Sequence, residues 1–159
     1  DLDCRVPLSL YVLEDEHPRF KPRDTSFARL IEADQGTRPM SAAPELLFAR
    51  RVRDLWNLGI AHLSPQIYSD LQQLVSSGAM RDSTVVQAFA AVFKASGPVP
   101  PQMPLALTTH ASRDKDLCQM WRAFQKRSRV PEVDLASVLD GLRRYALPLL
   151  DAARNDVAS

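Results

Sequence analysis

Four basic side chains near the end of one amphipathic segment are the strongest candidate for a functional surface in this sequence. They are Arg122, Lys126, Arg127 and Arg129, called the basic strip below. Arg122 and Lys126 are four residues apart and Arg129 follows three later, so these three would share one face of a helix. Residues 113–129 hold six basic and two acidic side chains, a local charge of +4, whereas the whole chain carries +1.

Three interpretations of the basic strip are open. Cations are favoured at a helix C-terminus by the helix dipole, so the strip could be an ordinary solvated helix end. It could also face an acidic protein partner. A third use is binding to nucleic-acid phosphates, which would make the affinity depend on salt. The near-neutral chain as a whole is not typical of a basic nucleic-acid binder, so any such role would rest on this segment.

The residue types that usually carry catalysis are scattered. His17, His62 and His110 lie far apart, and their spacing relative to Cys4 and Cys118 does not indicate a metal site. There is no glycine-rich phosphate loop, no GxSxG turn and no HExxH pair. We therefore predict that the protein is not an enzyme and uses no cofactor.

Other chemistry-bearing residues have simpler structural interpretations. Asp114 and Asp116 are two apart and would not share a helix face, so we expect them to be acids at a helix N-terminus. Trp56 and Trp121 each have an arginine nearby, a pattern that can stack bases and bind phosphates. The same pattern is typical of a core tryptophan with arginines on the solvated side, and we expect both rings in the core.

Prolines and glycines mark where helices should begin and end. Pro44 opens an amphipathic segment that we expect to run to about His62, with Gly59 on its apolar face. Ser64 and Pro65 should begin the next helix, which Gly78 ends. The short junction predicts an antiparallel hairpin.

Three more helices follow in the prediction. The first should start after Asp82 or Ser83, the second should be capped by Ser112 or Asp114, and Pro131 should open the third. The middle one should bury Leu117, Met120, Trp121 and Phe124. Pro148 should kink or stop the last one, and the tail after Asp151 should fray.

The composition agrees with an all-α fold of about five helices in antiparallel hairpins. Alanine and leucine number 40 residues, against 15 for valine and isoleucine. A weak echo between the segments at Leu55-Trp56 and Met120-Trp121 leaves a helical repeat open as an alternative. We expect an extended N-terminal arm at 1–40 and a helical domain at 41–159, with a subdivision at the proline-rich connector 97–104.

The sequence also bears on membrane association and on the cellular compartment of the protein. No apolar run approaches the ~20 residues that span a bilayer. Two distant thiols should stay reduced, which favours the cytoplasm, an organelle matrix or a virion interior.

We hypothesise a non-catalytic helical subunit or adaptor of a larger multi-protein assembly, acting through its surfaces and arm. The alternative is a helical RNA- or DNA-binding module, nucleocapsid-like or organellar, that uses the basic strip with Arg50, Arg51 and Arg53. An enzyme with an unrecognised site is the second alternative.

Overall fold

A computed structural model describes most of the chain after residue 39. The described residues are 23–24, 40–60, 64–94, 99–100, 102–128, 130 and 132–157. The contacts divide the chain into two units, Asp1–Ala42 and Ala43–Ser159. In the first unit, β1 (Arg23–Asp24) and β2 (Met40–Ser41) pair antiparallel. The predicted arm at 1–40 falls mostly outside the described residues, so it stays a prediction.

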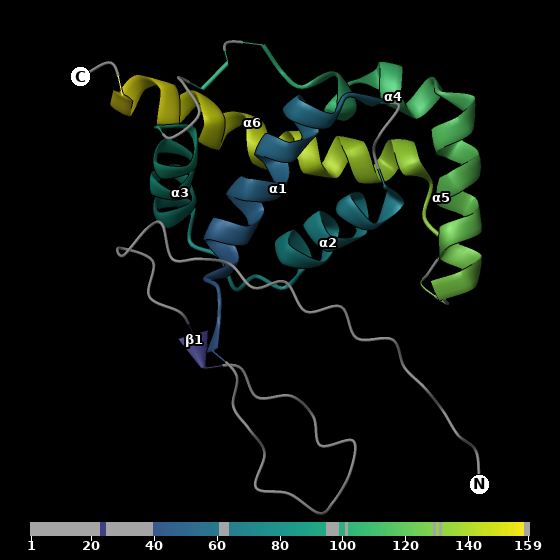
Figure 1. Ribbon diagram of the computed structural model, residues 1–159, viewed down its shortest axis with the longest axis horizontal. Helices are drawn as coiled ribbons and strands as arrows, with labels where there is room; N and C mark the ends of the chain where they lie inside the picture. Colours follow the sequence, from purple (N-terminus) through teal and green to yellow (C-terminus); the bar gives the residue numbers. More distant parts are fainter. Residues whose placement is uncertain are drawn as a thin grey trace, which may run out of the picture. The chain divides into compact units, whose positions relative to one another are not determined.

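The second unit is built from helices (Figure 1). They are α1 (Pro44–Leu58), α2 (Pro65–Ser76), α3 (Asp82–Lys94), the 3-10 turn η2 (Leu105–Leu107), α4 (Thr109–Arg113), α5 (Lys115–Ser128) and α6 (Leu135–Val157). The prediction of an all-α fold is confirmed. Because α6 contacts both α2 and α3, the segments before and after the proline-rich connector share one core.

Local signals explain where two helices begin. The Ser64 hydroxyl accepts a hydrogen bond from the Gln66 N–H at 3.3 Å, and Pro65 occupies the first helical position. The Asp114 carboxylate accepts one from the Leu117 N–H at 2.8 Å. Amides in the first turn of a helix have no partner within the helix, so these side chains satisfy them. The predicted cap at Ser64 is confirmed, and of the two predicted candidates for α5, Ser112 and Asp114, the structure shows Asp114 in this role.

The predicted end of the first helix is wrong. α1 ends at Leu58, and Gly59 follows it with a φ of 63°. That left-handed conformation favours glycine, so Gly59 ends the helix instead of lying on its apolar face. His62, the expected end, lies outside the described residues. α1 contacts α2, its predicted hairpin partner, and has its most extensive contacts with α3.

The last helix differs from the prediction at both ends. α6 begins at Leu135, whereas the predicted opening residue, Pro131, lies outside the described residues. The helix also continues through Pro148 to Val157, so neither the stop at Pro148 nor the frayed tail after Asp151 is observed.

Packing explains why α6 continues past its proline. Leu149, Leu150 and Ala153 are buried beyond Pro148, and burial of an apolar face outweighs the backbone hydrogen bond that proline removes. Arg154 adds a tertiary bond, since its Nε and Nη2 donate to the Pro100 carbonyl at 3.0 and 2.6 Å.

Aromatic packing joins α1, α3 and α6. Phe48 of α1 is fully buried. Its ring meets Phe89 of α3 edge-on at 5.9 Å and Tyr145 of α6 at 5.4 Å between centroids. α6 adds a buried apolar stripe that includes Leu135, Val138, Leu139, Leu142 and Ala146.

Two tyrosines make tertiary hydrogen bonds in different surroundings. Tyr68 of α2 is fully buried and donates to the Ala106 carbonyl of η2 at 2.9 Å; burial raises the pKa of its phenol. Half-buried Tyr145 donates to Oδ1 of the exposed Asp82 at 3.1 Å. Burial, with a smaller contribution from this bond, raises the pKa of Tyr145 to about 12.

The same chemical change at these two tyrosines should have unequal effects on stability. Tyr68→Phe leaves the Ala106 carbonyl without its donor in the core and should lower the free energy of unfolding by about 1–3 kcal/mol. Tyr145→Phe should cost no more than about 1 kcal/mol, because exposed Asp82 can bind water instead. Urea denaturation followed by circular dichroism measures both. Equal losses in the two variants would contradict this assignment.

Candidate functional site

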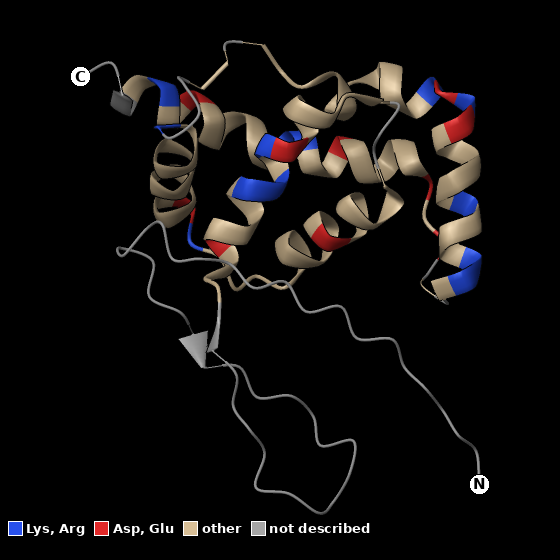
Figure 2. Cartoon of the chain, in the orientation of Figure 1, with Lys and Arg blue, Asp and Glu red and all other residues tan. Residues whose placement is uncertain are grey.

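The described members of the basic strip lie on α5, whose ribbon carries several basic segments in Figure 2. Arg122, Lys126 and Arg127 are all exposed. Arg129 lies outside the described residues. The opposite side of the helix buries Leu117, Trp121, Phe124 and Gln125. The helix that carries Arg122, Lys126 and Arg127 is therefore held in place by its opposite side, which packs in the core.

Met120 does not lie in the core as predicted, because it is 41% exposed on the same outer side of α5. Met120 and Arg127 are seven residues apart, which brings them within about 20° of one another around the helix axis, whereas Arg122 lies about 160° from Met120, at the other edge of the exposed side. We call Met120, Arg122, Lys126 and Arg127 the α5 face. Within the part of the chain that the structure describes, no carboxylate lies within ion-pair distance of its three cations.

The arginines of α1 are held differently from those of α5. Arg51 pairs with Asp70 of α2 at 3.3 Å, and Asp70 also accepts a hydrogen bond from Gln66 at 2.7 Å. Arg53 lies 3.9 Å from Asp54. Burial raises the pKa of Asp54, an effect that the neighbouring arginines oppose. Arg51 thus joins α1 to α2, whereas the acidic neighbour of Arg53 lies within α1 itself; the cations of α5 have no such carboxylate among the described residues.

The two tryptophans have different surroundings. Trp121 is 3% exposed, as expected for a core residue, and its indole N–H donates to the Val133 carbonyl at 2.8 Å. Trp56 is only half-buried; its ring meets Phe93 edge-on at 5.4 Å and its N–H donates to the Gln102 carbonyl at 3.2 Å. Trp121 therefore offers no ring face to a base.

The thiol of Cys118 is held by a backbone carbonyl. Cys118 is half-buried, and its thiol donates to the Ser112 carbonyl at 3.2 Å. Asp114 caps α5, and exposed Asp116 follows in its first turn, as predicted for N-terminal acids. Cys4 lies outside the described residues.

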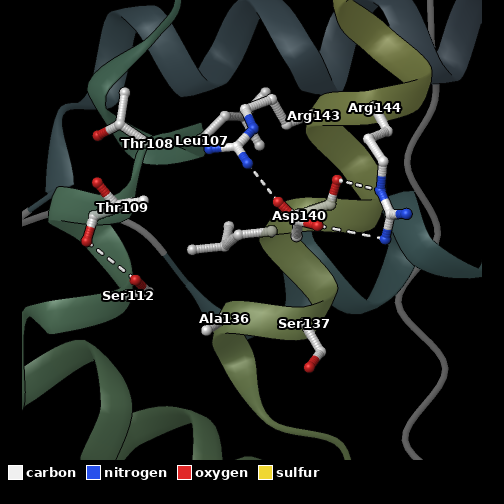
Figure 3. A pocket seen from close by; sticks show the side chains of 10 residues that line it. Leu107, Thr108, Thr109, Ser112, Ala136, Ser137, Asp140, Arg143 and Arg144 are labelled. Atoms are coloured by element: carbon white, nitrogen blue, oxygen red, sulfur yellow. Dashed lines mark hydrogen bonds and ion pairs between the residues drawn. The ribbon is translucent and has the colours of Figure 1, made fainter.

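A second candidate site is a cleft between α6 and the η2–α4 segment (Figure 3). Its volume is about 360 Å³, and it is lined by Leu107, Thr108, Thr109, Ser112, Ala136, Ser137, Leu139, Asp140, Arg143 and Arg144. Sequence reasoning missed it. The available signal was Asp140 followed by arginines three and four residues later, a spacing that brings all three side chains together on a helix.

One carboxylate organises the charged wall of this cleft. Asp140 Oδ1 accepts a hydrogen bond from Nη2 of Arg143. Its Oδ2 lies 3.2 Å from Nη2 of Arg144, and its backbone carbonyl accepts from Nε of the same arginine at 3.4 Å. The Arg143 side chain is 38% exposed and that of Arg144 is 76% exposed. Arg143 is thus the more enclosed of the two cations.

The described residues contain no group of three or more His, Cys, Asp or Glu side chains placed to hold a metal ion. No helix among them is both long and apolar enough to cross a membrane. The chain matches no family model, no curated protein and no solved structure. The α5 face and the cleft are therefore the candidate binding sites of this chain.

Truncating the two tryptophans should separate their roles. Trp121→Ala removes a buried ring and the bond to Val133, so it should lower the free energy of unfolding by about 3–5 kcal/mol. Trp56→Ala should cost less, about 0.5–3 kcal/mol, because that ring is partly solvated. Chemical denaturation followed by circular dichroism gives both values. A larger loss of unfolding free energy in Trp56→Ala than in Trp121→Ala would contradict this assignment of the two roles.

Proposed function

We propose that the protein is a non-catalytic helical subunit of a larger assembly and that its α5 face binds an acidic segment of another protein chain. The observation that carries this proposal is the exposure of Arg122, Lys126 and Arg127 with no carboxylate at ion-pair distance among the described residues. Arg122 and Lys126 are one turn apart, where like charges destabilise a helix slightly. An acidic partner would relieve this repulsion.

The helix dipole does not account for the whole α5 face. Its influence falls off within the last turn of a helix. Lys126 and Arg127 lie in the last turn of α5 and fit that explanation. Arg122 lies in the middle of the helix, so its exposed cation needs another reason. A binding role supplies one.

Met120 favours a protein partner over a nucleic acid. Methionine and arginine are enriched in protein interfaces, where a flexible thioether fits irregular apolar contacts. Phosphate binding has no use for an exposed methionine. Single-stranded nucleic acids also bind through stacked aromatic rings, and the tryptophan of α5 is buried. Nucleic-acid binding by the same three cations remains the second candidate because their spacing suits phosphates as well.

The triple change Arg122→Gln, Lys126→Gln, Arg127→Gln tests the proposal in the full chain. The probes are a fluorescent peptide that alternates Glu and Leu and a single-stranded RNA of equal net charge, both followed by anisotropy at low salt. The triple variant should bind the peptide about 3- to 150-fold more weakly, as expected for three exposed ion pairs of ~0.2–1 kcal/mol each. Its melting temperature should change little, because all three side chains are solvated.

A matched control removes the same charge elsewhere. Arg81, Lys94 and Arg113 are exposed and lie outside α5, so changing all three to Gln should leave peptide binding nearly unchanged. Met120→Ser should weaken binding of the peptide but not of the RNA. RNA binding that exceeds peptide binding and is insensitive to Met120→Ser would favour the second candidate. No binding of either probe by the wild-type chain would end both.

A further inference from the structure

The cleft beside α6 carries positive charge that its own carboxylate does not balance. Arg143 and Arg144 share Asp140, and no other acidic side chain lines the cleft. One negative charge against two positive charges leaves a net charge of +1 on the lining. A cleft with this charge suits an anion rather than a cation.

Arg143 has hydrogen-bonding capacity to spare. A guanidinium carries five N–H donors in a planar fork. Arg143 uses Nη2 toward Asp140, and none of the described groups accepts from its other nitrogens. Figure 3 shows its side chain reaching from α6 toward Leu107 and Thr108, whereas Arg144 lies on the other side of Asp140. Asp140 thus orients Arg143 while leaving most of its donors available.

The opposite wall supplies one uncommitted hydroxyl. Thr108 donates to the Leu105 carbonyl at 2.7 Å, and Ser112 donates to the Thr109 carbonyl at 2.9 Å, so both hydroxyl protons are engaged. The exposed Thr109 hydroxyl has no acceptor among the described residues. A ligand with several acceptor oxygens could therefore meet Arg143 on one wall and Thr109 on the other.

The volume and the apolar lining of the cleft suit a ligand larger than a bare inorganic anion. Small-molecule clefts typically measure ≈ 300–1,000 Å³ and combine an apolar lining with a few polar groups. This one, at about 360 Å³, includes Leu107, Ala136 and Leu139 in its lining. From this geometry we propose that the cleft binds a small organic phosphate ester, with the phosphate on Arg143 and Thr109 and the carbon skeleton against the apolar lining. The site is independent of the α5 face.

Three ligand probes test this proposal by two-dimensional NMR on the full chain at constant ionic strength. They are inorganic phosphate, phenyl phosphate and benzoate. Phenyl phosphate should produce saturable shifts at residues lining the cleft and should bind more tightly than inorganic phosphate, because its ring covers apolar surface. Benzoate should bind more weakly than phenyl phosphate, since a carboxylate offers two acceptor oxygens where a phosphate ester offers three.

Arg143→Gln and Arg144→Gln form a matched pair. Each removes one positive charge and one partner of Asp140, but only Arg143 reaches toward the opposite wall. Arg143→Gln should weaken phenyl phosphate binding about ten-fold or more, the loss of a charge-assisted hydrogen bond, and Arg144→Gln by no more than about three-fold. Thr109→Val removes the exposed hydroxyl at constant shape and should also weaken binding, which keeps the test informative if an arginine variant unfolds.

Several results would overturn the proposal. One is an absence of saturable shifts in the cleft with phenyl phosphate. Another is an equal loss of binding in Arg143→Gln and Arg144→Gln, which would indicate a diffuse charge effect. Benzoate binding as tight as that of phenyl phosphate would exclude a phosphate site. Shifts confined to α5 would assign the anion to the α5 face instead.

Discussion

Burial of the apolar stripe of α6 is the constraint on which the rest of the helical unit depends. α6 contacts α2, α3, η2 and α4, so most other elements take their position from it. The gain from covering this stripe is large enough to carry the helix through Pro148, where one backbone hydrogen bond is lost. Tyr145 extends the same packing into the aromatic contact with Phe48, which fixes α1 against α6. Without the packing of this stripe, α6 would neither form one wall of the cleft nor hold Tyr145 against Phe48.

The α5 face is fixed through the segment that leads into α6. Trp121 and Gln125 both donate to the Val133 carbonyl, at 2.8 and 2.9 Å. These two bonds tie the inner side of α5 to the residues just before α6, which leaves the cations of the α5 face pointing to solvent. The buried aromatic ring and the exposed cations are thus two sides of one helix. A protein partner would meet a preformed helical surface and would not have to order it, which lowers the entropy cost of binding.

Sequence reasoning succeeded where the signal was local and failed where it depended on contacts between distant segments. The caps at Ser64 and Asp114 could be predicted because a cap bonds an amide two or three residues away. Met120 has the spacing of a buried residue, but none of the described elements buries it, since it stays 41% exposed, and helical periodicity cannot reveal this. The cleft was missed because its walls come from separate parts of the chain. Arg143 and Thr109 lie in different helices, and only the packing of α4 on α6 brings them to one site.

The positions of carboxylates decide what each arginine does in this protein. Arg51 meets Asp70 across two helices, and their bond joins elements of the fold. Arg122 meets no such partner in the described part of the chain, so its charge is directed at solvent or at another molecule. Arg143 lies between these extremes, because Asp140 fixes its orientation while Arg144 competes for the same carboxylate. An arginine that is held in place but incompletely neutralised has already lost much of its side-chain entropy, so an anion that binds it recovers more of the interaction energy.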